Sequence, residues 1–320
     1  MGSLNSLFDN FWGQPGQLRA GPRRGPSALL LLAALASACG GDDPEPEAQP
    51  TSAPFSVMTY NVLCSFCGSG EYDTWDERQP YFKDTFARYD ADLIGLQELA
   101  FGTEVDQLLT LMDGYASVYY AAVDSNLTYP DATVLYRTER FELLESGQFW
   151  LSPTPDVPSS TGFAEQQLPR LVAWTKLRDL QTGQVIYFAS THVDNNSPSQ
   201  AKSAPLILER AAPWAAEAPV VFLGDFNSKP DTEAYQILTT SQGFHFVNSQ
   251  ALAKEWLVDS NETPVPTYDL ADRIDHIFLG SGAVDWSVSK WSVDVHRYGP
   301  NQRYPSDHFP MAAVIQAADR

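Results

Sequence analysis

Basic residues are scarce in this chain of 320 residues. Its 20 lysines and arginines face 40 aspartates and glutamates, which gives a formal net charge of −20, and no basic run of the kind that tracks a polyanion occurs. A surface with this charge repels nucleic acid and anionic lipid headgroups at long range unless cations intervene. The composition therefore argues against a tight duplex-DNA binder, but it allows an enzyme that screens phosphates with divalent cations.

An apolar run near the N-terminus is too short to cross a bilayer as a helix. Arg23 and Arg24 precede this run, residues 28–36, and small residues follow it before Cys39. This order is typical of an export signal, and its ending resembles a bacterial lipobox, in which the cysteine is lipidated. An ordinary cleaved signal is the alternative. Residues 1–38 are predicted to be a lipoprotein-type signal, and the protein is predicted to be exported.

A lipidated Cys39 would anchor the protein in the membrane as an outer-membrane or cell-surface lipoprotein, whereas an ordinary signal would release it as a secreted protein. Residues 39–53 are rich in proline, glycine and acidic side chains, which favours an extended tether. No later linker and no repeat of fixed period interrupts the chain. We therefore expect one domain over residues 54–317, and nothing in the sequence implies a protein partner.

Only two other cysteines occur, Cys64 and Cys67, just after the first predicted strand. In an exported chain this spacing can close as a small disulfide loop, and two free thiols are the main alternative. A zinc site would need two more ligands, which no second cysteine or histidine pair supplies. Redox chemistry would favour a helix after the motif, whereas glycines follow here. A structural disulfide is the preferred interpretation.

Apolar, β-prone segments alternate with helical patterns along the predicted domain. The predicted strands are 55–61, 93–97, 117–122, 132–136, 143–150, 171–178, 185–192, 220–224, 274–279, 284–293 and 310–315. The predicted helices are 77–89, 104–112, 199–216 and 232–239. These strands fall into two comparable halves and are too numerous for one open sheet. The pattern favours an α/β fold of two packed sheets with helices outside.

Polar residues stand at the ends of several of these apolar runs. They are Asn61, Gln97, Glu98, His192, Asp225, Asn227, Asp275, Asp307 and His308. Strands that stop on polar residues place them along one rim of a sheet, where they can converge on one metal ion and one phosphate. The sequence therefore predicts a phosphoesterase site that no single motif would establish.

Hydrolysis of a phosphodiester at neutral pH needs a cation, a base and donors for the phosphate oxygens. Glu98 suits Mg²⁺, which prefers one or two carboxylates, and Mn²⁺ is a candidate substitute. Asn61 could add an amide oxygen or position the nucleophile. Asp225 and Asn227 lie two residues apart and so face the same side of an extended segment.

Other residues supply candidate bases and phosphate contacts. A buried Asp275 could hold the ring of His308 and raise its basicity. Arg170, just before a predicted strand, has the planar fork that binds two phosphate oxygens, and Asn195 extends the segment beyond the histidine of the rim. Asp131, which follows a proline, is interpreted as a turn or cap residue.

As a set, these segments resemble the endonuclease/exonuclease/phosphatase superfamily, which includes deoxyribonuclease I, abasic-site endonucleases, neutral sphingomyelinases, inositol polyphosphate 5-phosphatases and poly(A)-removing nucleases. The motifs follow the family's order over residues 55–315. The resemblance implies a four-layer α/β sandwich, in which two packed mixed β-sheets carry helices on the outside, as in deoxyribonuclease I. It also implies that Glu98 is the main metal ligand with Asn61 near it, and that Asp307 completes the metal or nucleophile environment.

The resemblance assigns the catalytic residues as well. His308 would be the base or a phosphate contact, paired with Asp275, and Asp225 would orient the attacking water. Asn227 and His192 would bind the scissile phosphate. The leading expectation is a Mg²⁺-dependent, nuclease-like phosphodiesterase that uses direct attack by water on a phosphate-ester substrate.

Three alternatives remain at this stage. A sphingomyelinase or phospholipase C would gain from a lipid tether, although no apolar hairpin suited to membrane insertion is evident. A small-molecule phosphomonoesterase is the second, and absence of cleavage of the nucleic-acid and lipid diesters would indicate it. Residues 147–155 resemble a subset of bacterial members of the superfamily, but this match does not settle the substrate. A non-catalytic binding lipoprotein is the third, but such proteins usually lack some of the site residues that this chain retains.

Overall fold

The computed structural model describes residues 52–68, 70–124, 127–163, 166, 168–282 and 284–319. The predicted export signal, Cys39 and the tether up to residue 51 lie outside these residues, so their predictions stay untested. Among the described helices, none combines the length and the apolar character that a membrane crossing requires.

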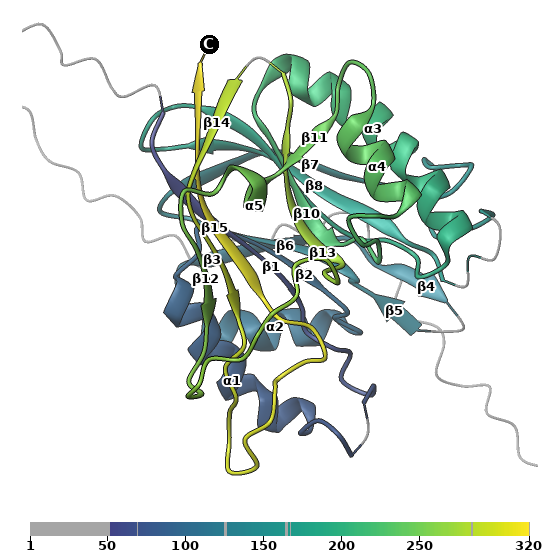
Figure 1. The fold of residues 1–320 in the computed structure, drawn as a ribbon. Coiled ribbons are helices and arrows are strands. Elements are labelled where there is room, and N and C mark those ends of the chain that lie inside the picture. The colour runs from purple at the N-terminus through teal and green to yellow at the C-terminus, as the bar shows by residue number, and fades with distance from the viewer. Residues whose placement is uncertain are drawn as a thin grey trace, which may run out of the picture. The chain divides into compact units, whose positions relative to one another are not determined.

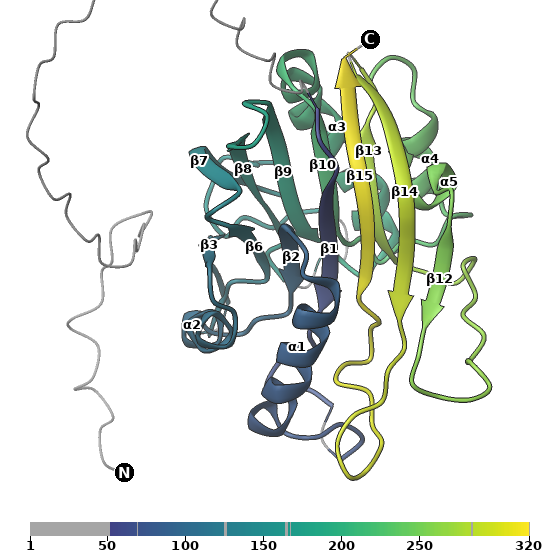
Figure 2. The same ribbon diagram turned by 90° about the vertical axis from the view of Figure 1, so that its left-hand side faces the viewer.

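Two β-sheets dominate the described part of the chain (Figure 1). The seven-stranded sheet runs in the order β12 (Trp256–Asp259), β14 (Val284–Asp294), β15 (Met311–Asp319), β1 (Phe55–Asn61), β2 (Leu93–Gln97), β6 (Ala132–Arg137) and β3 (Tyr115–Tyr119). The six-stranded sheet runs in the order β11 (Phe246–Asn248), β13 (Asp275–Gly280), β10 (Val220–Asp225), β9 (Val185–His192), β8 (Leu171–Asp179) and β7 (Phe141–Trp150). Figure 2 shows β1, β15 and β14 side by side, as their antiparallel pairing requires.

Helices cover the outer face of each sheet (Figure 1). They are α1 (Trp75–Tyr89), α2 (Gly102–Leu111), α3 (Ser197–Glu217) and α4 (Glu233–Thr240). The short α5 (Ser249–Leu252) instead contacts strands of both sheets. Helices α1 and α2 pack on the seven-stranded sheet, and α3 and α4 pack on the six-stranded sheet. The predicted four-layer α/β sandwich is therefore confirmed.

The central strands form because both of their faces are apolar. In β1, Val57 packs toward the other sheet, whereas Met58 and Tyr60 pack toward the helices. In β10, Leu223 faces the inter-sheet core and Phe222 faces α3 and α4. Successive side chains point to opposite faces, so a strand between a sheet and a helix layer must be apolar throughout.

Strand direction gathers the polar strand ends at one edge. Strand β1 runs parallel to β2, and β9 runs parallel to β10, so each pair finishes at one edge of its sheet. The hydrogen bond between Asn61 and Asp225 shows that the two edges meet. In the second pair Asp225 lies opposite His192, and on its other side it lies opposite Asp275, the first residue of the antiparallel β13. The pairing therefore brings the ends of five strands to one rim.

Two glycines allow the close approaches that this rim requires. A Cβ atom on Gly95 would lie 2.1 Å from Cδ1 of Leu223, across the interface between the sheets. A Cβ atom on Gly224 would lie 2.0 Å from the carbonyl oxygen of Thr191, and its φ of +146° also favours glycine. A larger residue at Gly224 would force the backbones of β9 and β10 apart, and one at Gly95 would displace the side chain of Leu223.

The predicted elements differ from the structure mainly at short or peripheral segments. The predicted strand 117–122 is wrong in extent, because β3 ends where β6 stops offering a partner, and Ala122 instead starts the separate hairpin of β4 (Ala122–Asp124) and β5 (Leu127–Tyr129). The sequence also did not predict β5, β11, β12 or α5. Elements of three or four residues show no measurable periodicity and depend on pairing with distant strands.

Candidate functional site

Asp225 lies at the centre of a polar cluster on the rim. Its buried Oδ2 accepts a hydrogen bond of 3.1 Å from Nδ2 of Asn61. The same oxygen lies 3.4 Å from Nε2 of His192 and 3.6 Å from Nε2 of His308. Its Oδ1 accepts the backbone N–H of Asn227 at 2.8 Å. Three side chains far apart in the sequence, those of Asn61, His192 and His308, thus meet around one carboxylate.

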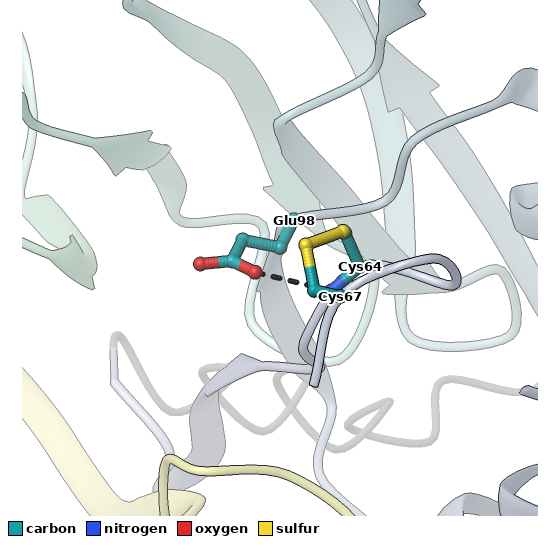
Figure 3. Close-up of side chains that lie close together, drawn as sticks. All are labelled: Cys64, Cys67 and Glu98. Atoms are coloured by element: carbon teal, nitrogen blue, oxygen red, sulfur yellow. Dashed lines mark hydrogen bonds between the residues drawn. A yellow bond between two sulfur atoms is a disulfide. The ribbon is translucent and has the colours of Figure 1, made fainter. Parts of the chain in front are cut away.

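Glu98 is held beside this centre by the same amide. Its Oε1 accepts a hydrogen bond of 2.9 Å from Nδ2 of Asn61, and its Oε2 accepts the backbone N–H of Cys64 at 3.0 Å (Figure 3). Oδ1 of Asn61 in turn accepts the backbone N–H of Leu63, which fixes the orientation of the amide. As folded, Asn61 presents its amide nitrogen, not its oxygen, to the two carboxylates.

The backbone at Glu98 is strained. Its φ is +66°, in the left-handed region that residues with a Cβ rarely adopt. Asn227, next to the central carboxylate, shares this conformation with a φ of +50°. Strained backbone persists where surrounding contacts fix it, and it concentrates at functional sites. Both residues were singled out from the sequence on other grounds.

Cys64 and Cys67 are joined by a disulfide, which closes the loop after β1 (Figure 3). Their sulfur atoms lie close enough to Glu98 for the three side chains to form a group of metal-ligand size. Because both sulfurs are engaged in the disulfide, neither is a thiolate ligand. The loop instead acts on Glu98 through the backbone N–H of Cys64.

Two histidine–aspartate pairs flank Asp225. Nδ1 of His308 lies 2.8 Å from Oδ2 of Asp275, and Nδ1 of His192 lies 2.8 Å from Oδ1 of Asp131. In each pair the carboxylate contacts Nδ1, so that Nε2 faces the central carboxylate. An aspartate in this position orients the ring and stabilises its charged form.

Burial lowers the pKa of His308, but Asp275, Asp225 and Asp307 outweigh it and raise that pKa to about 10. For His192, burial and Arg170 lower the pKa, while Asp131 and Asp225 raise it, and the net shift is upward.

Asp131 is the site residue that the sequence interpretation missed. It was assigned to a turn, yet it is buried, accepts hydrogen bonds from Arg170 and from the backbone N–H of Glu98, and contacts His192. Burial raises its pKa, but His192 and Arg170 outweigh this and hold the pKa well below its usual value. It reaches the rim because it precedes β6, whose first residue lies opposite the last residue of β2.

The remaining predicted residues lie at the margin of the cluster. Arg170 does not project freely, because its Nη1 contacts Asp131 and lies 2.9 Å from Nδ1 of His192. Nδ2 of Asn227 donates to the carbonyl oxygen of Val193. Asp307 is exposed and accepts a hydrogen bond of 3.3 Å from Oγ of Ser306. Asn195 is also exposed, and its Oδ1 accepts from the neighbouring Asn196.

The donor set fits a hard divalent cation. Ligand atoms of Asp225, Asp275 and His308 lie within 4.8 Å of one another, and Glu98 lies beside them through the shared amide of Asn61. Oδ1 of Asp275 is buried without a hydrogen-bond partner, which is unfavourable unless a cation or proton satisfies it. Carboxylate-rich, partly hydrated sites of this kind suit Mg²⁺.

A cavity of about 190 Å³ opens beside the cluster. It is lined by Cys64, Phe66, Cys67, Glu98, Tyr129, Asp131, Leu168, Pro169, Arg170 and His192. A larger cavity of about 680 Å³ lies near the end of α3 and the start of β14 and contains none of the cluster residues. The smaller cavity is therefore the one that a bound phosphate ester would meet.

Comparison with known proteins agrees with this geometry. Residues 58–308 match the model of the Endonuclease/Exonuclease/phosphatase family. The match covers most of the chain, and the chain belongs to this family. Its members are hydrolases that act on phosphate esters, and the family is generally dependent on divalent metals.

Individual relatives show how far this similarity extends. A solved endonuclease/exonuclease/phosphatase from Bacteroides vulgatus is 22% identical with a TM-score of 0.71, and the match covers 83% of this chain and 100% of that one. A mannosyl-6-phosphatase from Bacteroides thetaiotaomicron VPI-5482 is 26% identical with a TM-score of 0.68, covering 82% and 99%. The CCR4-Not complex 3'-5'-exoribonuclease subunit Ccr4 of Saccharomyces cerevisiae is 20% identical, and the match spans 82% of this chain but 38% of Ccr4.

Proposed function

We propose that the protein is a Mg²⁺-dependent phosphoesterase that hydrolyses its substrate by direct attack of water, with Mn²⁺ as a substitute. One observation carries the proposal. Two imidazole nitrogens and one amide nitrogen lie within 3.6 Å of Oδ2 of Asp225, and the same amide holds Glu98. In this arrangement Asp225 can orient a water molecule, the nitrogens of the two imidazoles and the amide can donate to phosphate oxygens, and Glu98 can bind a cation.

Glu98 is the principal metal ligand in this proposal, and Asp307 lies on the exposed side, where it can complete the metal environment. When bound, the cation draws charge off the phosphate. Asn61 keeps Glu98 and Asp225 in a fixed relation through its amide nitrogen. Arg170 acts through Asp131 and His192, since its contacts leave it less free to clamp a phosphate oxygen.

Asp225 orients the attacking water and accepts its proton through Oδ2. In the metal-free protein the pKa of His308 is raised to about 10, which favours a protonated ring that can donate a hydrogen bond to the phosphate. His192 donates from the opposite side of Asp225, and Asn227 contacts the phosphate next to it. Donors already fixed in a buried site stabilise the charge that develops during attack.

The substrate class has two candidates. The name of Ccr4 as a 3'-5'-exoribonuclease favours a nuclease-like phosphodiesterase. The mannosyl-6-phosphatase, which is matched over nearly its whole length, favours a small phosphomonoester. The small cavity and the net charge of −20 also favour the second candidate, because a polyanion would be repelled over most of its length.

Hydrolysis of a substrate panel tests the proposal. Plasmid DNA, RNA, sphingomyelin, bis-p-nitrophenyl phosphate and p-nitrophenyl phosphate would be assayed with Mg²⁺, with Mn²⁺ and with a chelator. We expect metal-dependent release from at least one ester, and loss of that release in Glu98→Gln. Folded protein that cleaves none of them and no sugar phosphate, or that cleaves equally well without metal, would refute the assignment.

Export and anchoring are further parts of the proposal. A lipidated Cys39 would hold the domain at a membrane surface through the acidic tether. Labelling with a radioactive fatty acid tests this in the expressing bacterium. The wild-type chain should be labelled and Cys39→Ser should not, whereas an unlabelled wild-type chain recovered from the medium would indicate a secreted protein.

A further inference from the structure

Two loop segments form much of the wall of the cavity beside the cluster. The disulfide loop lies on one side, with Phe66 between its two cysteines, and Leu168 and Pro169 belong to another lining segment. Glu98 and His192 also line this cavity and belong to the rim cluster. A phosphate bound at the cluster would therefore direct its ester group into the space that these residues enclose. We name this space the disulfide pocket.

The side chains of the disulfide pocket are mostly apolar. The disulfide, Phe66, Tyr129, Leu168 and Pro169 make up half or more of its lining. Phe66 is 55% exposed, although a phenylalanine side chain is normally buried. Its ring centroid lies 6.3 Å from that of Phe101, which is 37% exposed. Exposed aromatic faces beside a cavity provide a surface on which the flat face of a ring can pack.

The size of the disulfide pocket limits its occupant. Its volume is about 190 Å³. Sites for drug-sized ligands have volumes of roughly 300–1,000 Å³. The alcohol half of the substrate must therefore be small, of the order of one ring. A stack of bases or the two chains of a sphingolipid would have to extend beyond it.

The charge of the disulfide pocket also favours a small substrate with a single phosphate. Arg170 is the only lysine or arginine among its described lining residues, and Asp131 neutralises it. Proteins that follow a single strand need a positively charged groove along the backbone. With Glu98 and Asp131 in the lining, further phosphates of a polymer would meet negative charge. A substrate with one terminal phosphate avoids this repulsion.

We propose that the disulfide pocket binds the alcohol half of a compact phosphate monoester that carries one ring, of the size of a hexose phosphate, and that Phe66 determines this specificity. The inference rests on the proposed phosphoesterase function and narrows it to a substrate class. Water attacks the phosphorus atom, the bond between phosphorus and the ester oxygen breaks, and the ring leaves as a free alcohol with inorganic phosphate as the second product.

Two matched substrates test the inference. A hexose 6-phosphate and glycerol 3-phosphate are both monoesters of a primary alcohol, but only the first carries a ring. Phe66→Ala should lower kcat/KM for the hexose phosphate about tenfold, because a packed aromatic face is lost, and should change the value for glycerol phosphate by less than about threefold. Leu168→Trp, which fills the pocket, should exclude the hexose phosphate and spare the glycerol phosphate.

Leu180→Ala is the matched control. Leu180 is 54% exposed, nearly as exposed as Phe66, but it lies in the turn before β9, at the end of that strand opposite His192. This variant should leave both substrates unchanged. Equal losses on both substrates in Phe66→Ala, or no loss on either, would overturn the inference, as would an enzyme that cleaves RNA faster than it cleaves the hexose phosphate.

Calorimetry separates this inference from the proposed function. In a His308→Gln background, the hexose phosphate should bind more tightly than glycerol phosphate, and a second change of Phe66→Ala should remove the difference. Ring-dependent binding by a wild-type protein that hydrolyses neither these two esters nor any member of the substrate panel would refute the function and keep the pocket. Hydrolysis of both esters at rates that do not depend on the ring would refute the proposed role of the disulfide pocket, while the proposed phosphoesterase function would stand. Absence of both binding and hydrolysis would refute both.

Discussion

The two histidines that flank Asp225 are held in different ways. His308 is paired with Asp275, whose Oδ1 is buried without a partner, and its side chain is 14% exposed. His192 is paired with Asp131, and its side chain is 4% exposed. Asp131 is shared with an arginine, whereas no lysine or arginine salt bridge to Asp275 occurs in the described part of the chain.

We call His308 with Asp275 the reactive side of the site, and His192 with Asp131 and Arg170 the rigid side. Around His308 the carboxylates exceed the cations, so that region attracts a proton or a metal ion. Around His192 the positive charge of Arg170 offsets Asp131, and both are nearly enclosed. A buried ion pair with balanced charges holds the side chains around it in place. An excess of negative charge instead shifts pKa values and binds cations, which are properties of a catalytic group.

Removal of the reactive side should have the largest effect. His308→Ala should lower kcat about a thousandfold, within the range seen when a positioned proton donor or acceptor is lost. The fold should survive, because this ring is partly exposed. Initial rates with Mg²⁺ and a circular dichroism spectrum check both points.

His245→Ala is the control for that variant, since His245 lies away from the rim and its ring nitrogen Nδ1 contacts the carbonyl oxygen of Gly243. Its rate should match the wild type. A His308→Ala protein that keeps more than a tenth of the wild-type rate would contradict the division between the two sides.

Disruption of the rigid side should act through stability as well as rate. Asp131→Asn leaves the buried Arg170 without its charge partner, and a broken buried pair costs about 3 kcal/mol of unfolding free energy. We expect kcat to fall about a hundredfold, less than for His308→Ala, because the ring of His192 loses its orientation. Urea unfolding and steady-state rates measure the two effects.

A double variant sharpens this result. Asp131→Asn combined with Arg170→Gln removes both charges and should recover more than half of the lost stability, but not the rate. If Asp131→Asn alone is as stable as the wild type, the Asp131–Arg170 pair does not provide the rigidity assigned to it.

The contrast also shows what the sequence could reveal. Asn61, Glu98, His192 and Asp225 follow apolar runs, and strands that run parallel finish at the same edge, so their convergence could be predicted. Asp131 precedes its strand instead. Because β6 runs antiparallel to β2, its first residue reaches the rim, and this follows only when the strand order is known.

The disulfide pocket was equally hidden in the sequence. Its walls come from segments about a hundred residues apart, around Cys64 and around Leu168, and no periodic pattern links two loops. The four-layer architecture was predictable because buried strands have an apolar signature on both faces. Loop contacts have no such signature, and they determine the substrate.

The disulfide loop offers a smaller perturbation at the metal side. Cys67→Ser opens the loop, but it leaves in place the backbone N–H of Cys64 that donates to Glu98. With that donor less firmly held, the affinity for Mg²⁺ should fall about tenfold, as for other groups that orient a metal ligand. Mg²⁺ titration by calorimetry measures it. An unchanged affinity would show that Glu98 is positioned without the loop.

The last prediction is a pH dependence of stability that arises from His308 and its pairing with Asp275. In the folded, metal-free protein its pKa is raised to about 10. In the unfolded chain it returns to about 6.5. A raised folded pKa stabilises the fold fully below the unfolded value, and this contribution is lost as pH rises through the folded value. The stability difference between wild type and His308→Gln should therefore be largest below about pH 6.5 and shrink toward pH 10.

Urea unfolding in a chelator, from pH 6 to 10, would follow this difference. His276→Gln is the contrasting variant, because burial lowers the pKa of His276 to about 3, and it stays neutral across the upper part of the range. Its stability difference should be constant above about pH 7. A constant difference for His308→Gln as well would mean that Asp275 and Asp225 do not hold a proton on His308, and the reactive side would then differ from the rigid side in exposure alone.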